Sequence, residues 1–429
     1  MRKFLFLLLI SLFILPSFSK EPIERKIEKI VNGITPELIE IRRDIHSHPE
    51  LSFQEKRTSS IVANYLRKLG LDVREGIAGT GVLGILRGSK PGPVIGMRAD
   101  MDALPITEET GLPFASKVKV MIDGRETGVM HACGHDVHTT ILLGVANVLS
   151  KLKDEISGTI LFVAQPAEEW GDGANEMLKA GVFKDIKPEV MFAFHVDDEL
   201  MPGYIRYTSG YSGANCDGFH LIIKSQGCHG SSPHSCVDPI VVGSEIVLAL
   251  QVMVSREISV HNNTVITVGS FHSGTAPNVI PQKAEMRAIV RSYGEEQRKI
   301  LKEKVERVIK NICESAGADY ELNYYFGTPS LYNNPDLLKS ILPTVERVLG
   351  GKNFLIEGLP EMGGEDFSYF AREIPSVMLG LGVCPPDVKG NSVHSPTFLV
   401  DERSIPIGVK VMANIILDYL RKGMVKKGS

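Results

Sequence analysis

The sequence lacks the features that mark several broad classes of protein. Outside its two termini it has no dense run of Lys and Arg, and its formal net charge is −4, so it has no electrostatic footprint of a nucleic-acid-binding protein. Six cysteines in 429 residues are too few for a disulfide scaffold. Internal repeats and low-complexity segments are also missing. The composition is that of an ordinary globular protein, with 43% hydrophobic and 23% charged residues. The length of the chain predicts two or three folding units.

Residues 1–19 show the succession of residue types that is typical of a secretory signal peptide. Arg2 and Lys3 precede an apolar run over 4–15, and the small residues Ser17 and Ser19 follow it. The alternative is an uncleaved membrane anchor, but the run is shorter than the roughly 20 apolar residues that span a bilayer. We therefore expect the signal peptide to be cleaved and to leave no stable membrane anchor. We also expect that no later segment crosses a membrane and that the protein is secreted or periplasmic.

The cysteines are scattered along the chain. In an oxidising compartment some of them could pair, and Cys228 with Cys236 is one such pair, whereas scattered cysteines of a large domain are more often buried free thiols. The six are Cys133, Cys216, Cys228, Cys236, Cys313 and Cys384.

Short apolar runs alternate with helical patterns, which predicts an α/β catalytic domain with a mostly parallel sheet and helices on both faces. This pattern covers 20–207 and resumes over 327–429. Between them, 208–326 reads as β-α-β-β-α-β, the split ferredoxin-like α+β arrangement, and we expect an inserted domain there. The first helix is expected over Glu24–Ile45, with a break near Gly33 and Pro36.

Residues of metal-ligand type lie in four separate places: Cys133 and His135, Glu168 and Glu169, His195, and His394. Glu168 and Glu169 follow one predicted strand and His195 follows another. In open α/β sheets the functional crevice lies at the carboxyl ends of the strands, so these side chains are expected to meet. Gly134 allows a tight turn that directs its two neighbours to one site.

Thiolate, imidazole and carboxylate together suit Zn²⁺, Mn²⁺, Co²⁺ or Ni²⁺ rather than Ca²⁺ or Mg²⁺. Five ligands, Cys133, His135, Glu169, His195 and His394, are too few to saturate two ions, so positions remain for water and substrate. A divalent ion can lower the pKa of water from 15.7 to roughly 7, and the free neighbour Glu168 could then serve as the general base.

Each residue also has an ordinary interpretation. An isolated pair of Glu residues usually lies on the solvated surface. A single His such as His195 is usually a half-buried side chain with a hydrogen-bond partner. Cys133 with His135 could instead be a thiol nucleophile and its base. The conjunction of all four clusters favours the two-metal interpretation.

Several long motifs occur in an order that resembles the amidohydrolase branch of the metallopeptidase family that includes aminoacylase, glutamate carboxypeptidase, hippurate hydrolase and auxin-conjugate hydrolases. The resemblance spans about His46 to Asp401. It rests on the motifs at 46–53, 98–105, 131–138, 165–169, 229–234, 278–281, 364–367 and 394–396.

This resemblance implies a dinuclear catalytic domain and a smaller lid domain that also forms a homodimer. Cys133 would bridge the metals, Glu169 and His394 would complete one site, and His135 and His195 the other, with Glu168 as the base. A lid histidine, matched by His229, would reach the partner's active site and stabilise an oxyanion, and Asn278 would assist it. Arg291 would hold the substrate's carboxylate, or would be a surface arginine of its strand.

Two features are departures, of which the first is from the peptidase branches and fits the amidohydrolase branch. Arg98 stands where the peptidase branches have a His, and Cys133 replaces their bridging carboxylate, so Asp100 is expected behind the ligands rather than on a metal. Asp197 and Asp198 follow His195, where relatives more often have a nearby Pro; they would change the charge of the pocket or form a solvated loop.

We therefore predict a metal-dependent hydrolase of N-acyl amino acids or similar small amides. The alternatives are a metallo-carboxypeptidase or dipeptidase that acts on small peptides, and a non-catalytic binding protein. The second alternative requires a missing base or ligand, and the sequence has all of them.

Overall fold

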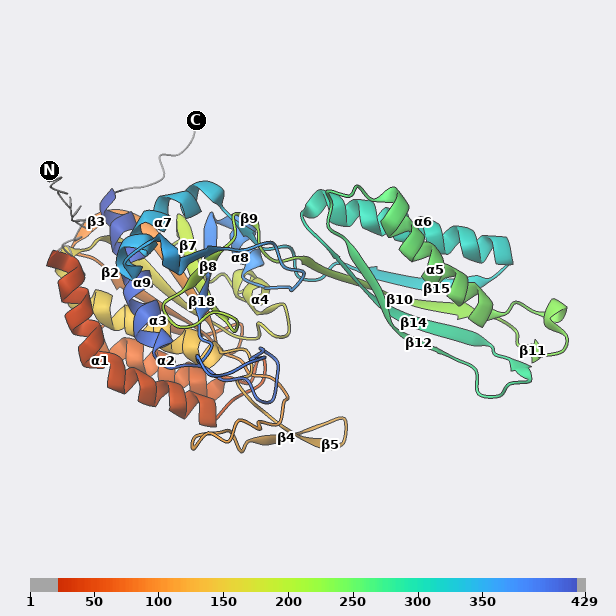
Figure 1. The fold of residues 1–429 in the computed structure, drawn as a ribbon, viewed down its shortest axis with the longest axis horizontal. Coiled ribbons are helices and arrows are strands. Elements are labelled where there is room, and N and C mark those ends of the chain that lie inside the picture. The colour runs from red at the N-terminus through yellow and green to blue at the C-terminus, as the bar shows by residue number, and fades with distance from the viewer. Residues whose placement is uncertain (1–21, 423–429) are drawn as a thin grey trace, which may run out of the picture.

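The computed structural model of the protein describes residues 22–422, so the expected signal peptide over 1–19 lies outside the described residues. The chain forms a large α/β unit and a smaller unit that projects from it (Figure 1). This arrangement confirms the predicted fold class.

The large unit is built on an eight-stranded mixed sheet in the order β1-β2-β6-β3-β7-β18-β8-β17. Its strands are β1 (Asp72–Ile77), β2 (Gly81–Arg87), β3 (Lys90–Asp100), β6 (Ser157–Gln165), β7 (Val190–Asp197), β8 (Ile205–Tyr207), β17 (Leu355–Glu357) and β18 (Ser376–Gly382). The central run β6-β3-β7-β18 is parallel throughout. A hairpin of β4 (Lys119–Ile122) and β5 (Arg125–Gly128) lies outside this sheet.

Helices cover both faces of the large sheet, as the apolar strand runs predict. One face carries α1 (Pro22–Ser47), α2 (Lys56–Lys68), α3 (His135–Lys151), α7 (Pro335–Leu349) and α9 (Ser404–Lys422). The other carries α4 (Gly173–Lys179) and α8 (Ser368–Glu373). Along β6 the side chains alternate between the two cores: Phe162 joins the first and Leu161 the second.

The predicted break in the first helix is wrong, because α1 runs unbroken through Pro36. A proline inside a helix removes one backbone hydrogen bond. Against this loss, a stripe that includes Ile27, Val31 and Leu38 is fully buried in the core shared with α3 and α9. Tertiary packing of the apolar face therefore outweighs the local signal.

The smaller unit has its own four-stranded antiparallel sheet in the order β12-β14-β10-β15. Its strands are β10 (Asn215–Lys224), β12 (Val265–Ser273), β14 (Lys283–Ser292) and β15 (Asp319–Tyr325), and its helices are α5 (Pro239–Glu257) and α6 (Glu295–Ala316). Both helices pack on one face around a separate core. We call this unit the lid.

Short ladders mark the two ends of the lid. Where it joins the large unit, β9 (Gly210–Tyr211) pairs with β16 (Tyr332–Asn333). At the far tip, β11 (Cys228–His229) pairs with β13 (Val279–Ile280) (Figure 1). The tip is therefore the part of the lid that lies farthest from the large sheet.

Among the helices within 22–422, α5 alone is long and apolar enough to cross a membrane by length and composition, with a mean hydropathy of 1.5, contrary to the sequence-based expectation. One such helix is weak grounds for a span. Its inner side chains, among them Val242 and Ile246, are buried against the lid sheet, whereas Leu248 on the outer side is 68% exposed.

Candidate metal centre and active site

Three neighbouring parallel strands end at the same edge of the large sheet. The strands β6, β3 and β7 end at Gln165, Asp100 and Asp197. Glu168 and Glu169 lie just beyond β6, and His195 lies in the last part of β7. This edge is where an open α/β sheet carries its functional crevice.

The turn before α3 brings Cys133 and His135 to the same place. Gly134 has φ of +75°, and a Cβ there would lie 2.7 Å from Val196 Cγ1 on β7. Both facts require glycine, since a side chain would be strained and would collide with the strand. His135 is then the first residue of α3, fully buried, and faces the strand ends.

The five predicted ligands come together as two sets that share one sulfur. Cys133, His135 and His195 form one set, and Cys133, Glu169 and His394 form the other, with the ligand atoms of each set within 4.8 Å of one another. Cys133 Sγ lies 3.4 Å from His195 Nε2 and 3.3 Å from His394 Nε2. His394 Nε2 lies 3.4 Å from Glu169 Oε1.

Two of these ligand atoms are buried and have no hydrogen-bond partner among the described residues: His135 Nε2 and Glu169 Oε1. A buried polar atom without a partner is costly, so its environment must normally supply one. The nitrogen and oxygen lie 3.8 Å apart and point into the cluster that also holds the Cys133 sulfur. Unpartnered N and O atoms that converge with a cysteine sulfur on one space fit two borderline divalent cations.

Asp102 organises this cluster, and the sequence prediction missed its role. Its carboxylate is 3.2 Å from His135 Nδ1, which leaves Nε2 of that ring directed at the ligands. It also accepts hydrogen bonds from the backbone N–H groups of Glu168 and Glu169, at 3.1 and 3.0 Å, and from the Ser52 hydroxyl. Burial would raise the pKa of Asp102, but the hydrogen bond and charge of His135 outweigh it and lower the pKa. A carboxylate behind a ligating His fixes its tautomer and orientation.

Asp100 lies behind the ligands, bonded to other side chains. Its carboxylate pairs with Arg98 at 2.7 Å and with His138 Nδ1 at 2.6 Å. The backbone N–H of Val196 donates to His138 Nε2 at 2.8 Å, so both nitrogens of that ring are occupied. Burial lowers the pKa of His138 to about 4, which agrees with a neutral ring that accepts this bond. His138 therefore braces β7 and is not available to a metal.

Glu168 lies among other acids. Burial raises its pKa well above the usual range, and the charges of Glu365, Glu169 and Asp366 add to the effect. Burial likewise raises the pKa of Asp366 to about 8, against the opposing charge of Arg98. The Arg98 guanidinium donates to both Glu365 and Asp366, at 2.9 and 3.0 Å. This explains the departure at position 98: an arginine there offsets a buried group of carboxylates.

The buried position of Cys133 does not favour a thiol nucleophile. Burial raises the pKa of the Cys133 thiol well above its ordinary value, although the nearby His135 opposes this. Reactive cysteines need the opposite shift, because the thiolate is the nucleophile. A cation beside the sulfur would stabilise the thiolate as a ligand instead.

Strained backbone places two of the candidate site segments. His394 has φ of +61° and Ala167, just before Glu168, has φ of +53°. Non-glycine residues with such angles cluster at functional sites, where the surroundings hold them. The N–H of His394 donates to Ala132 O at 2.8 Å, and Ala167 N–H donates to Glu55 at 2.8 Å.

The two acids after His195 have structural partners. Asp198 accepts a 2.7 Å hydrogen bond from the backbone N–H of Val393, so it anchors the loop that carries His394. Asp197 pairs with Arg206 and accepts from the N–H of Leu200 at 3.0 Å. Neither acid is simply a solvated side chain.

The lid residues divide into two groups. Arg291 lines the cleft of about 990 Å³ that also contains Cys133, Glu168 and His394. Among residues 22–422 it forms no ion pair, and its guanidinium donates a hydrogen bond to the Cys216 sulfur. His229 and Asn278 lie together at the lid tip, where Gly230 N–H donates to Asn278 O at 2.7 Å. His229 lines a different hollow. Within one chain the structure therefore does not bring these two to the candidate metal centre.

Comparison with known proteins agrees with this geometry. Residues 96–418 match the model of peptidase family M20/M25/M40. The chain belongs to this family. It is 38% identical to thermostable carboxypeptidase 1 of Saccharolobus solfataricus over 92% of this chain and 99% of that protein. It is 37% identical to N-acetylcysteine deacetylase of Bacillus subtilis over 89% of this chain and 97% of that protein.

The fold is also found in solved structures. The Bacillus subtilis YXEP protein, described as a dinuclear metal binding peptidase from the M20 family, superposes with a TM-score of 0.78 at 33% identity. The match covers 92% of this chain and all of that one. The family, the fold class and the assignment as a hydrolase, each predicted from the sequence, are confirmed.

Proposed function

We propose that the protein hydrolyses the amide bond of N-acyl amino acids or closely similar small amides. The observation that carries the proposal is the pair of ligand sets that share Cys133, with Glu168 beside them and outside both. A relative named N-acetylcysteine deacetylase supports the substrate class. The roles of individual residues below are part of the proposal.

We propose that two divalent transition-metal ions, Mn²⁺, Zn²⁺, Co²⁺ or Ni²⁺, are held by Cys133, His135, Glu169, His195 and His394. When bound, such ions polarise a carbonyl and lower the pKa of water. Glu168 would take the proton from the attacking water and return it to the leaving nitrogen. Its place next to a ligand, 3.9 Å from His135 Nε2, suits this role.

Arg291 is proposed to bind the substrate's carboxylate. It reaches the cleft from β14 of the lid and has no acidic partner within 22–422. A guanidinium can hold a carboxylate by two parallel hydrogen bonds, which would orient the amide toward Glu168.

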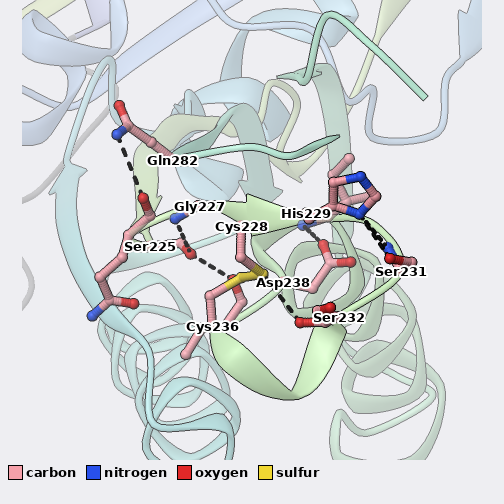
Figure 2. The surroundings of a disulfide bond; sticks show 12 residues. Ser225, Gly227, Cys228, His229, Ser231, Ser232, Cys236, Asp238 and Gln282 are labelled. Carbon is pink, nitrogen blue, oxygen red and sulfur yellow. Dashed lines mark hydrogen bonds between the residues drawn. A yellow bond between two sulfur atoms is a disulfide. The ribbon is translucent and has the colours of Figure 1, made fainter. Parts of the chain in front are cut away.

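His229 is proposed to act in the active site of the partner subunit, with Asn278 beside it. The backbone N–H of Ser231 donates to His229 Nδ1 at 3.1 Å (Figure 2). Because an N–H can only donate, Nδ1 is the acceptor, and the neutral ring carries its proton on Nε2. That outward N–H is suited to stabilise an oxyanion.

The lid has a surface suited to a homodimer. Val241, Leu248 and Val252 on the outer side of α5 are 58–68% exposed, and β12 is an edge strand of the lid sheet. An exposed apolar patch beside an open strand edge is typical of an association surface. Pairing there would bring each lid to a second copy of the chain.

We propose that the mature protein acts outside the cytoplasm, after cleavage of the signal peptide. The Cys228–Cys236 disulfide supports this, since disulfides persist in oxidising compartments. Separation of periplasm from extracellular space requires fractionation of the producing cells.

The test is release of free amino acid from a panel of N-acyl amino acids. Purified mature protein is stripped by a chelator and reloaded with Mn²⁺, Zn²⁺, Co²⁺ or Ni²⁺. Activity that disappears on chelation and returns with a metal is expected. Activity that survives complete metal removal would contradict the proposal.

A second candidate is a carboxypeptidase, favoured by the similarity to thermostable carboxypeptidase 1 and by an unpaired Arg291 that could hold a C-terminal carboxylate. N-acyl amino acids and dipeptides with the same C-terminal residue distinguish the two. A kcat/KM that is higher for the dipeptides would favour the carboxypeptidase.

A further inference from the structure

The segment that carries His229 has little noncovalent support. None of residues 228–238 is buried, and His229 to Ser231 are exposed. Only two residues of β11 pair with β13. The other ties are few: Gly230 N–H donates to Asn278 O at 2.7 Å, Ser225 Oγ donates to Val237 O at 2.6 Å, and Asp238 caps α5. A loop with so few buried contacts lies at the low end of local stability.

One covalent bond closes this segment (Figure 2). Cys228, directly before His229, is joined to Cys236, two residues before the α5 cap, with a Cα–Cα distance of 6.0 Å. The disulfide therefore fastens β11 to the start of α5. That helix is packed into the lid core through Val242 and Ile246, so the bond fixes the exposed segment to a rigid element.

The bond also constrains the direction of His229. Successive side chains of a strand point to opposite faces, so a Cys228 side chain fixed toward Cys236 directs His229 to the other side. Figure 2 shows the imidazole beside Ser231 and apart from the sulfur atoms. Without the bond, the two-residue ladder, the Gly230–Asn278 hydrogen bond and the contact with Ser231 would remain to hold the ring.

We infer that the Cys228–Cys236 disulfide is a positioning element for His229, so that turnover depends on the redox state of the lid tip. This rests on the proposed role of His229 in the partner subunit's active site. Reduction by a water-soluble phosphine would cleave the S–S bond, with two electrons and two protons passing to the sulfurs and an oxygen from water to the phosphine oxide. The four other cysteines are free thiols and lack this response.

The experiment compares the metal-loaded dimer before and after reduction with the Cys228→Ala/Cys236→Ala double variant. Misplacement of a catalytic group by about 1 Å can cost up to ~100-fold, so we expect kcat to fall about 10-fold with KM within twofold. The double variant should show the same fall and no further response to phosphine. Cys313→Ala, which removes a buried free thiol of the lid, should respond like the unmodified protein.

A double-mutant cycle separates positioning from general stabilisation. In a His229→Ala background, removal of the disulfide should leave kcat unchanged, because the group that it positions is already gone. Equal falls in both backgrounds would overturn the inference. The inference would also be overturned if kcat were unchanged in the reduced protein and in the double variant while kcat of His229→Ala fell about 100-fold. That result would leave the proposed function intact. Full activity of His229→Ala would instead refute the proposed role of His229, and the inference with it.

Discussion

The two parts of the candidate active site are built in opposite ways. In the catalytic unit, Asp102 is 1% exposed and contacts four donors, and His135 is fully buried. At the lid tip, His229 is exposed and is held by Ser231 and a neighbouring disulfide. One part is fixed by a dense hydrogen-bond network and the other by a turn and one covalent bond.

This difference follows from what each part must do. Metal ligands must converge in a fixed geometry, and burial with directed hydrogen bonds provides it. A group that meets the substrate only when two units approach must stay exposed beforehand. Such a group cannot be held by a surrounding core, so local ties must orient it.

The largest expected effect separates two adjacent carboxylates of the buried part. Glu168→Gln should lower kcat by about 10³-fold, within the range for loss of a general base, and leave the metal content unchanged. Glu169→Gln, the matched variant, should lose metal because its Oε1 belongs to the set with Cys133 and His394. Steady-state kinetics and metal analysis of both proteins check this. Equal metal loss in the two variants would contradict the division of roles.

The next effect tests whether the exposed part acts across subunits. Glu168→Gln and His229→Ala homodimers should each be nearly inactive. Hybrid dimers restore one intact site, in which Glu168 of one chain meets His229 of the other. After random mixing, roughly a quarter of the sites should be active, since half of the dimers are hybrids with one good site each. Co-expression followed by activity measurement checks this, and no recovery would place His229 in its own subunit's site or in none.

The same contrast explains what could be predicted from the sequence. The clustering of Cys133, His135, Glu169 and His195 could be predicted because they lie at strand ends or beside a glycine turn, both of which are local signals. Asp102 was missed because its role depends on four donors from 33 to 67 residues away. The unbroken α1 was missed for a related reason, since burial of Ile27 and Val31 against distant helices overrides Gly33 and Pro36.

At the lid tip the prediction left the pairing of Cys228 and Cys236 open. A separation of eight residues permits a bond but does not require it. The turn at Pro233–Ser235, a short 3₁₀ segment, brings the two cysteines together, and nothing in the local apolar pattern marks it. Exposed segments carry little hydrophobic periodicity, so their geometry is poorly determined by sequence.

A smaller effect is expected from the residue that supports the buried ligands. Asp102→Asn keeps the size of the side chain but weakens the bond to His135 Nδ1. Loss of such a partner typically lowers metal affinity about 10–100-fold, so the variant should bind metal more weakly and recover activity at higher metal concentration. Metal titration followed by activity checks this. The matched variant Asp197→Asn, whose carboxylate pairs with Arg206, should keep its metal affinity within a few-fold, and a similar loss there would contradict a specific role for Asp102.

The smallest effect concerns a buried histidine that the ligand sets do not use. His131 is 1% exposed, neither ring nitrogen has a hydrogen-bond partner within 22–422, and burial lowers its pKa to about 4. The folded state then binds fewer protons than the unfolded state, so this contribution to stability is complete above pH 6.5 and is lost as the pH falls toward about 4. The free energy of unfolding of the metal-free protein should fall between pH 6.5 and pH 5. In His131→Phe this fall should be smaller by about 2 kcal/mol, because the variant has no imidazole there to protonate. Urea unfolding at these pH values checks this. His261→Phe at an exposed lid position controls for the added aromatic ring, and an unchanged pH dependence in His131→Phe would show that the unpartnered ring is not the cause.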